Sequence, residues 1–183
     1  TEVLVHLYEQ DGLGFAKKLR GMFAFALWDR ARGRLVLGRD PLGIKPLYWG
    51  VFGNWLLFGS EIKVFYQNPA FKAEINPMAI DDHLTLMYIP TPLSIYKGLR
   101  KLEPGTVRVF DAQGRQETHT YWRGLPPCGP ANATPDPGNL ARIMESLENK
   151  ISECVKMSLR SDVPLGVFLS GGLDSATIAY FAK

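Results

Sequence analysis

A short apolar run, Val163–Leu169, leads directly into the residues Ser-Gly-Gly-Leu-Asp-Ser at positions 170–175, and a helical run follows. A strand, a glycine-rich turn and a helix in that order form the opening of an α/β nucleotide-binding domain. A phosphate chain needs several backbone N–H groups that converge from one side, and the start of a helix supplies them with a favourable dipole. The segment therefore predicts a phosphate-binding loop.

The residue types of this loop suit a phosphate chain held with a cation. Gly171 and Gly172 let the main chain approach closely and adopt positive φ, and Ser170 and Ser175 add hydroxyl donors. Asp174 would repel phosphate unless a divalent cation bridges them, and Mg²⁺ takes carboxylate and phosphate oxygens together. An ordinary strand–turn–helix connection with two turn glycines is the alternative interpretation.

The loop lacks the lysine of a Walker A motif. It is similar instead to the S-G-G-x-D-S loop of enzymes that adenylate a substrate and release pyrophosphate. That resemblance implies ATP and Mg²⁺ as ligands, with the metal reaching Asp174 through the pyrophosphate. The predicted ATP site comprises Leu169, Ser170, Gly171, Gly172, Leu173, Asp174 and Ser175.

The first two thirds of the chain carry mainly strand signals. A helix over Glu2–Gln10 is expected to come first, and Met22–Asp29 alternates large and small residues, which suits a strand packed on both faces. Asn76 would cap a helix that begins at Pro77. The other predicted strands, joined in pairs by glycine-containing turns, are Arg34–Asp40, Pro46–Val51, Trp55–Phe58, Gly105–Phe110 and Gln116–Tyr121, with a short helix at Glu61–Tyr66.

The composition changes sharply between residues 125 and 138, which hold five of the thirteen prolines and read as a linker. Beyond it, Asn139 is expected to cap a helix with one apolar stripe. We therefore predict three parts: residues 1–124, a linker at 125–138, and residues 139–183, which begin the nucleotide-binding domain. The predicted fold class is α+β followed by the start of an α/β domain.

Composition excludes several classes of protein. No apolar run approaches the roughly 18–20 residues that cross a bilayer, and nothing marks the chain for secretion, so we expect a cytoplasmic protein without a membrane partner. The net charge of +3 is too small and too dispersed for nucleic-acid binding. The two cysteines, Cys128 and Cys154, form neither a disulfide framework nor a metal site. Because the chain starts without Met and stops inside a helical run, we expect a fragment.

Four segments resemble glutamine-hydrolysing asparagine synthetases, and together they extend over nearly the whole chain. They are Leu19–Asp29 (LRGMFAFALWD), Gly38–Tyr48 (GRDPLGIKPLY), Ser60–Lys63 (SEIK) and Ser161–Ser175 (SDVPLGVFLSGGLDS). The resemblance implies the end of a class II glutamine amidotransferase domain, an N-terminally truncated αββα sandwich like that of the Ntn hydrolases, followed by an ATP-dependent synthetase domain. It also implies that ammonia released from glutamine displaces AMP from an adenylated aspartate, and that homodimers are possible.

The resemblance also implies that the catalytic residues of glutamine hydrolysis are missing here. The family's nucleophilic cysteine lies upstream of the position of Thr1, and its glutamine-holding aspartate falls immediately before that position. Thr1, Cys128 and Cys154 are each rejected as nucleophiles, because Thr1 aligns with an internal helix and neither cysteine has a base at motif spacing. Arg39 and Asp40 are expected to form a structural salt bridge, with a lining of the interface to the synthetase domain as the alternative.

Three functions stay open at this point. The first is a fragment of an asparagine synthetase that uses glutamine, aspartate and ATP, the fragment itself being inactive. The second is an enzyme like β-lactam synthetase, which shares the architecture and adenylates a carboxylate for ring closure. The third is a catalytically silent binding or folding module. A cysteine directly after the initiator Met of the complete protein would favour the first.

Overall fold

The computed structural model describes residues 1–124 and 137–183, and the chain divides into two compact units, Thr1–Leu125 and Pro126–Lys183. The boundary between them falls inside the predicted linker, most of which lies outside the described residues, as does Cys128. Each unit is described by itself.

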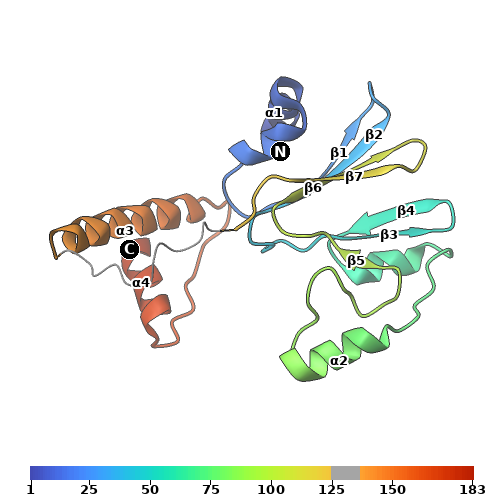
Figure 1. The fold of residues 1–183 in the computed structure, drawn as a ribbon. Coiled ribbons are helices and arrows are strands. Elements are labelled where there is room, and N and C mark those ends of the chain that lie inside the picture. The colour runs from blue at the N-terminus through green and yellow to red at the C-terminus, as the bar shows by residue number, and fades with distance from the viewer. Residues whose placement is uncertain (125–136) are drawn as a thin grey trace. The chain divides into compact units, whose positions relative to one another are not determined.

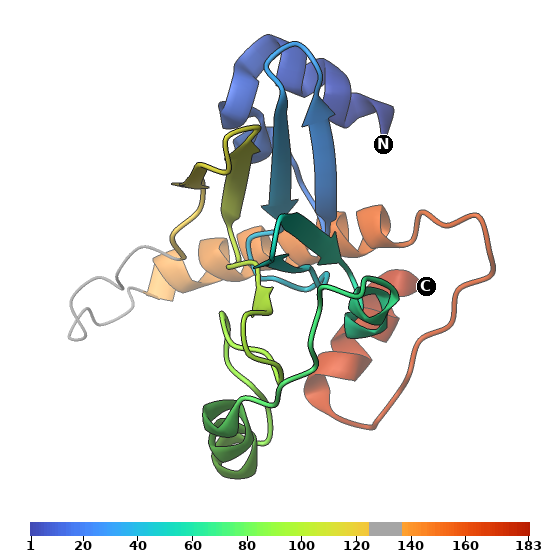
Figure 2. The ribbon, with the colours of Figure 1, turned by 90° about the vertical axis from the view of Figure 1, so that its right-hand side faces the viewer.

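The first unit begins with helix α1 (Glu2–Asp11) and the 3₁₀ helix η1 (Gly12–Lys18), followed by a four-stranded antiparallel sheet. The sheet has the order β1-β2-β6-β7, so the two hairpins lie side by side, as Figures 1 and 2 show in blue and yellow. Its strands are β1 (Ala24–Asp29), β2 (Arg34–Arg39), β6 (Thr106–Asp111) and β7 (Gln116–Thr120). Each of these strands lies within one residue or two of its predicted bounds.

A second antiparallel sheet has the order β4-β3-β5. Strands β3 (Tyr48–Phe52) and β4 (Trp55–Gly59) form a hairpin in which Trp49 lies opposite Phe58, and the two-residue strand β5 (Arg100–Lys101) pairs with the start of β3. The 3₁₀ helix η2 (Ile62–Gln67) follows β4, where the sequence predicts a short helix.

Three apolar clusters divide this unit into layers. The first joins α1 and η1 to the four-stranded sheet and includes Phe15 and Val36, and the second lies between the sheets and includes Leu37 and Trp49. The third joins the second sheet to η2 and the segment after it, around Phe65. Helix, sheet, sheet and helix are therefore stacked in four layers (Figure 1), which confirms the predicted αββα sandwich and the α+β class.

Strand β1 differs from its prediction on one face. Phe25 and Asp29 are buried on the face toward α1, but Ala26 is exposed on the other face and Trp28 is 61% exposed. The large–small alternation therefore does not mark a strand packed on both faces. Ala24 still packs against the cluster between the sheets, whereas the residues further along β1 extend past it.

Helix α2 (Pro77–Leu86) begins where the sequence predicts. The side chain of Asn76 accepts a 3.2 Å hydrogen bond from the backbone N–H of Met78, and Pro77 takes the first helical position. Both features suit a helix start, because the first N–H groups of a helix have no partner inside it and proline brings none.

The second unit contains helices α3 (Pro137–Ser158) and α4 (Leu173–Ala182) in its described part. Helix α3 begins two residues before the predicted cap Asn139. The predicted strand Val163–Leu169 is wrong, because that segment has no strand pairing. A strand needs a neighbouring strand for its backbone hydrogen bonds, and residues 137–183 provide none.

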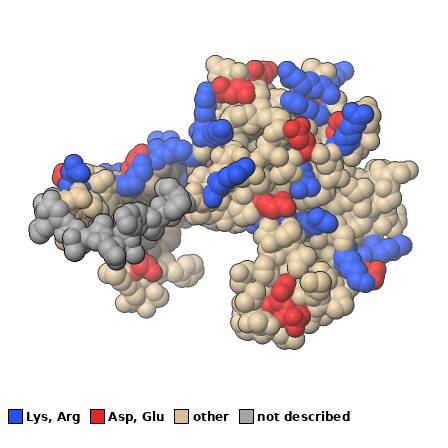
Figure 3. Space-filling model, in the orientation of Figure 1, with Lys and Arg blue, Asp and Glu red and all other residues tan. Residues whose placement is uncertain are grey.

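No helix in residues 1–124 or 137–183 is long and apolar enough to span a bilayer. On the face shown in Figure 3, basic side chains lie among acidic ones.

Candidate functional site

The glycine-rich loop has a defined conformation in the second unit. Gly171 has φ +81°, and Gly172 then takes the N-cap position of α4. An added Cβ at Gly171 would meet no atom within 4 Å, so the positive φ rather than a close neighbour requires glycine there. The turn directs the chain into α4 and leaves the N–H groups of the first helical turn without partners inside the helix.

The structure brings together the two predicted serines of the loop. The hydroxyl oxygens of Ser170 and Ser175 lie 3.0 Å apart, and the Ser175 hydroxyl also donates to the carbonyl of Gly172 at 3.0 Å. Ser170 is exposed and Ser175 is partly exposed, so both hydroxyls can turn toward a ligand. Leu169 and Leu173 are exposed beside them.

Asp174 occupies the first turn of α4, where a carboxylate is favoured by the helix dipole. Within the described parts of the chain, no three His, Cys, Asp or Glu side chains form a metal-binding group. The polar groups of this loop are the glycine backbone, two hydroxyls and one carboxylate. They fit a polyphosphate with a divalent cation better than a cation held by protein ligands alone.

A separate hollow of about 760 Å³ opens in the first unit along strand β1. Its walls come from Thr1 and α1, from the segment before β1, from β1 itself, from the loop after β2, and from Ser60 just after β4. The lining residues are Thr1, Val3, Leu4, Leu19, Arg20, Met22, Phe23, Ala24, Phe25, Ala26, Lys45, Pro46 and Ser60. This set combines apolar side chains with two cationic ones and no carboxylate, so it suits an anionic or carboxylate-bearing ligand.

The loop after β2 owes its shape to the buried carboxylate of Asp40. One oxygen accepts hydrogen bonds from the backbone N–H groups of Leu42 (3.2 Å) and Ile44 (3.0 Å), and the other accepts one from Lys45 (2.9 Å). Asp40 is only 1% exposed. These bonds satisfy a charge that burial would otherwise make costly, and they place Lys45 and Pro46 at the hollow.

Arg39 binds the same loop through its guanidinium group. It donates to the carbonyls of Gly43 (2.7 Å) and Lys45 (2.8 Å), and also to Leu102 (2.6 Å) in the core between the sheets. Burial lowers the pKa of Arg39, and the Asp40 carboxylate opposes this shift. Both side chains bind backbone groups inside the first unit, which gives them a structural role, but through backbone partners and not through the predicted salt bridge between them.

The rejected nucleophiles gain no support from the geometry. Cys154 is exposed on α3, and Thr1 caps the start of α1, where its backbone carbonyl accepts a 3.0 Å hydrogen bond from the N–H of Leu4. His6 has two exposed carboxylates nearby on the same helix, Glu2 at 3.7 Å and Glu9 at 3.6 Å.

Two features of the first unit were not predicted from the sequence. One is the hollow, and the other is a polar cluster of Tyr8, Asp29 and Arg34 that joins α1 to the β1–β2 hairpin. Helical spacing places Tyr8 on the apolar face of α1, but nothing in the sequence pairs it with a carboxylate 21 residues away.

Comparisons with known proteins give a consistent result for both units. Residues 1–122 match the family described as glutamine amidotransferase domain, and residues 146–183 match the family described as asparagine synthase. A putative glutamine-hydrolysing asparagine synthetase 2 from Methanocaldococcus jannaschii is 37% identical over 97% of this chain. The glutamine-hydrolysing asparagine synthetase 1 of Bacillus subtilis is 35% identical over the whole chain.

A protein named amidase chry2 from Gibberella zeae is also similar, at 35% identity over 97% of the chain. The chain spans 34%, 28% and 26% of the lengths of these three relatives, respectively. Each match therefore concerns about a third of a longer protein or less.

Proposed function

Because the chain belongs to the glutamine-hydrolysing asparagine synthetase family, with a glutamine amidotransferase domain followed by the start of an asparagine synthase domain, we propose that the whole protein makes asparagine. In this proposal it adenylates the side chain of aspartate and amidates it with ammonia from glutamine. The observation that carries the proposal is the loop Leu169–Ser175, whose two hydroxyls meet at the open start of α4.

The loop suits the pyrophosphate portion of ATP. ATP, when bound, would supply AMP as a leaving group and so make a carboxylate, which is a poor acyl donor, reactive toward ammonia. The N–H groups that begin α4 would hold phosphate oxygens, with Ser170 and Ser175 as added donors. Asp174 would bind the same oxygens through Mg²⁺. These assignments rest on donor chemistry and on the resemblance of the SGGLDS segment.

The hollow along β1 suits part of a glutamine pocket. Glutamine carries a carboxylate, and Arg20 and Lys45 bring positive charge to the hollow while Ser60 adds a hydroxyl. The family resemblance places the glutamine-holding aspartate immediately before the position of Thr1, and Thr1 itself lines the hollow. We therefore propose that residues 1–124 supply one wall of the site for glutamine.

We further propose that these 183 residues have no activity by themselves, because residues 1–124 contain no cysteine and the synthetase domain is represented only by its beginning. The proposal includes a cytoplasmic location, where aspartate, glutamine and ATP are found together. A homodimer is part of the same family expectation.

An amidase is the second candidate function, because amidase chry2 is nearly as similar to the chain as the asparagine synthetases are. The β-lactam-synthetase-like alternative also adenylates a carboxylate. The three candidate enzymes differ in the substrates and cofactors that they require.

The test is a substrate-omission assay on the complete protein that measures pyrophosphate release and asparagine formation. We expect both to require ATP, Mg²⁺ and aspartate, with either glutamine or ammonia as the nitrogen source. Pyrophosphate release that is independent of aspartate, or product formation without ATP, would contradict the proposal. Hydrolysis of an amide other than glutamine without ATP, with no asparagine formed, would favour an amidase.

A further inference from the structure

We infer that Arg39, Asp40 and Tyr121 form a positioning unit that fixes the wall of the hollow and thereby sets the affinity of the amidotransferase site for glutamine. The inference rests on the proposed function of that hollow. It concerns residues that lie behind the site and act through the loop of residues 40–46, whose last two members line the hollow.

Asp40 connects three parts of the first unit. Its carboxylate organises residues 42–45, its backbone N–H donates to the carbonyl of Phe23 at 2.8 Å, and its carbonyl accepts from Gly105 at 3.0 Å. Phe23 and Lys45 both line the hollow. Asp40 binds Phe23 through its backbone N–H and Lys45 through its carboxylate. A shift of Asp40 would therefore move two walls of the hollow together.

Arg39 ties the loop to the interior of the sandwich. Its bonds to the carbonyls of Gly43 and Lys45 hold the loop, while its bond to Leu102 anchors the guanidinium on a fully buried residue. The planar guanidinium can bind three carbonyls at once in fixed directions, which an ammonium on a flexible chain does less well. The loop therefore has a single well-defined position relative to the core.

Tyr121 closes the unit from the end of β7. Its hydroxyl donates a 2.6 Å hydrogen bond to the carbonyl of Arg39, and its backbone N–H donates to Gly105 at 2.9 Å. Burial, with a contribution from the Asp40 carboxylate, raises the pKa of Tyr121, so the hydroxyl stays a donor at alkaline as well as neutral pH. Tyr121 thus braces the loop from behind without lining the hollow.

The test uses Asp40→Asn and Tyr121→Phe in the complete protein. In Asp40→Asn, a single acceptor oxygen replaces the two carboxylate oxygens that bind the N–H groups of Leu42, Ile44 and Lys45. In Tyr121→Phe, the hydrogen bond to the carbonyl of Arg39 is lost. Because small misplacements in a site reduce rates and affinities strongly, we expect the KM for glutamine to rise about tenfold in Asp40→Asn and about threefold in Tyr121→Phe. Asparagine formation from free ammonia should stay unchanged, since it does not use the glutamine site.

Asp111→Asn is the matched control. The Asp111 carboxylate also accepts two backbone N–H groups, from Gln113 at 2.9 Å and Arg115 at 2.8 Å, but it lies at the β6–β7 turn and not among the lining residues. Its KM for glutamine should match that of the parent protein. An equal rise in this control would show that the effect is not specific to the unit, and would overturn the inference.

The remaining outcomes are also decisive. An unchanged KM for glutamine in Tyr121→Phe, or in a folded Asp40→Asn, would overturn the inference while leaving the proposed function intact. Loss of ammonia-dependent activity in Asp40→Asn together with a normal Tyr121→Phe would assign Asp40 to folding alone and also overturn it. If the parent protein makes no asparagine from glutamine, the proposed function fails instead.

Discussion

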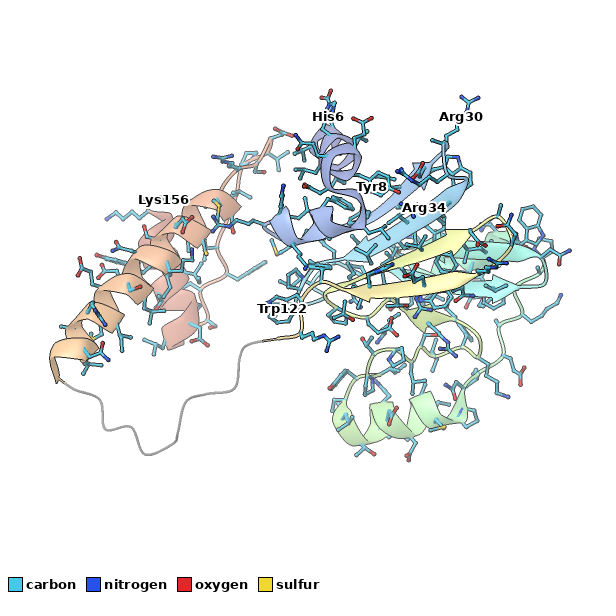
Figure 4. The ribbon with its side chains drawn as sticks, turned by 45° about the horizontal axis from the view of Figure 1, so that its top comes forward. His6, Tyr8, Arg30, Arg34, Trp122 and Lys156 are labelled. Atoms are coloured by element: carbon cyan, nitrogen blue, oxygen red, sulfur yellow. The ribbon has the colours of Figure 1, made fainter. Side chains whose placement is uncertain are left out.

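The hydroxyl of Tyr8 donates a 2.6 Å hydrogen bond to Oδ2 of Asp29, joining helix α1 to strand β1. Arg34 in turn donates to the Tyr8 oxygen through Nε (2.9 Å) and Nη2 (2.7 Å), and Figure 4 shows the two side chains meeting between α1 and the hairpin. Arg32 adds a bond from its backbone N–H to Oδ1 of Asp29 at 3.0 Å. Helix α1 contributes Val3 and Leu4 to the hollow, so this cluster holds one of its walls.

Replacing Tyr8 by phenylalanine is expected to lower the free energy of unfolding of the first unit by about 1–2 kcal/mol, because a buried hydrogen bond to a charged group is lost. Denaturant unfolding followed by tryptophan fluorescence measures this, since Trp28, Trp49, Trp55 and Trp122 all lie in that unit. Tyr66→Phe is the control, because the Tyr66 hydroxyl bonds only to Tyr96 at an exposed position. A control loss as large as that of Tyr8→Phe would contradict this account.

The stability of the first unit should depend on pH through Asp29. The hydrogen bond from Tyr8, aided by Arg32, lowers the pKa of Asp29 from 3.8 to about 2. Because the folded pKa lies below the unfolded one, the stabilisation is complete above about pH 4 and is lost as the pH falls toward 2.

The variant Asp29→Asn isolates this dependence. At pH 7 it should unfold at a lower denaturant concentration than the parent chain, and the gap should close between about pH 4 and pH 2. A gap that is constant over this range would show that the Asp29 carboxylate contributes nothing through its charge.

Gly105→Ala should destabilise the first unit more than Gly114→Ala. Both glycines have positive φ, +64° and +78°, so each alanine has a backbone cost of roughly 1–2 kcal/mol. An added Cβ at Gly105 would also lie 2.6 Å from the carbonyl oxygen of Trp122, whereas at Gly114 it meets nothing within 4 Å. Equal unfolding free energies for the two variants would contradict the tight packing of Trp122 on Gly105.

Glutamine hydrolysis by the 183-residue chain should be indistinguishable from background, because residues 1–124 contain no thiol nucleophile. The measurement is glutamate release from glutamine, with the complete protein as positive control. Thr1→Ala should change nothing. Release above background that disappears in Thr1→Ala would show that Thr1 acts as a nucleophile after all.

Local signals were enough to predict much of the fold. The strand pairs of the first unit follow from apolar runs broken by short turns, and Asn76–Pro77 marks the start of α2 correctly, because a cap depends on residues next to each other in the sequence. The strand predicted at Val163–Leu169 is wrong, because a strand depends on a partner that can be distant in the sequence. Its apolar residues need a neighbouring strand that residues 137–183 do not contain.

The candidate site could also be predicted only in part from the sequence. The contact between Ser170 and Ser175 could be expected from a short motif, because the two serines are only five positions apart in the sequence. The hollow could not, since Leu4, Phe23 and Lys45 come together only through the sandwich. The sequence suggested that Arg39 and Asp40 are structural, but their carbonyl and N–H partners depend on the path of the loop.

The most direct test of the central claim is the variant Asp174→Ala in the complete protein, with pyrophosphate release and glutamine hydrolysis measured side by side. If the loop Leu169–Ser175 binds the pyrophosphate portion of ATP with Mg²⁺, pyrophosphate release should fall by at least about a hundredfold while glutamine hydrolysis continues. Pyrophosphate release at the parent rate, or loss of both activities in a folded protein, would contradict the role assigned to this loop.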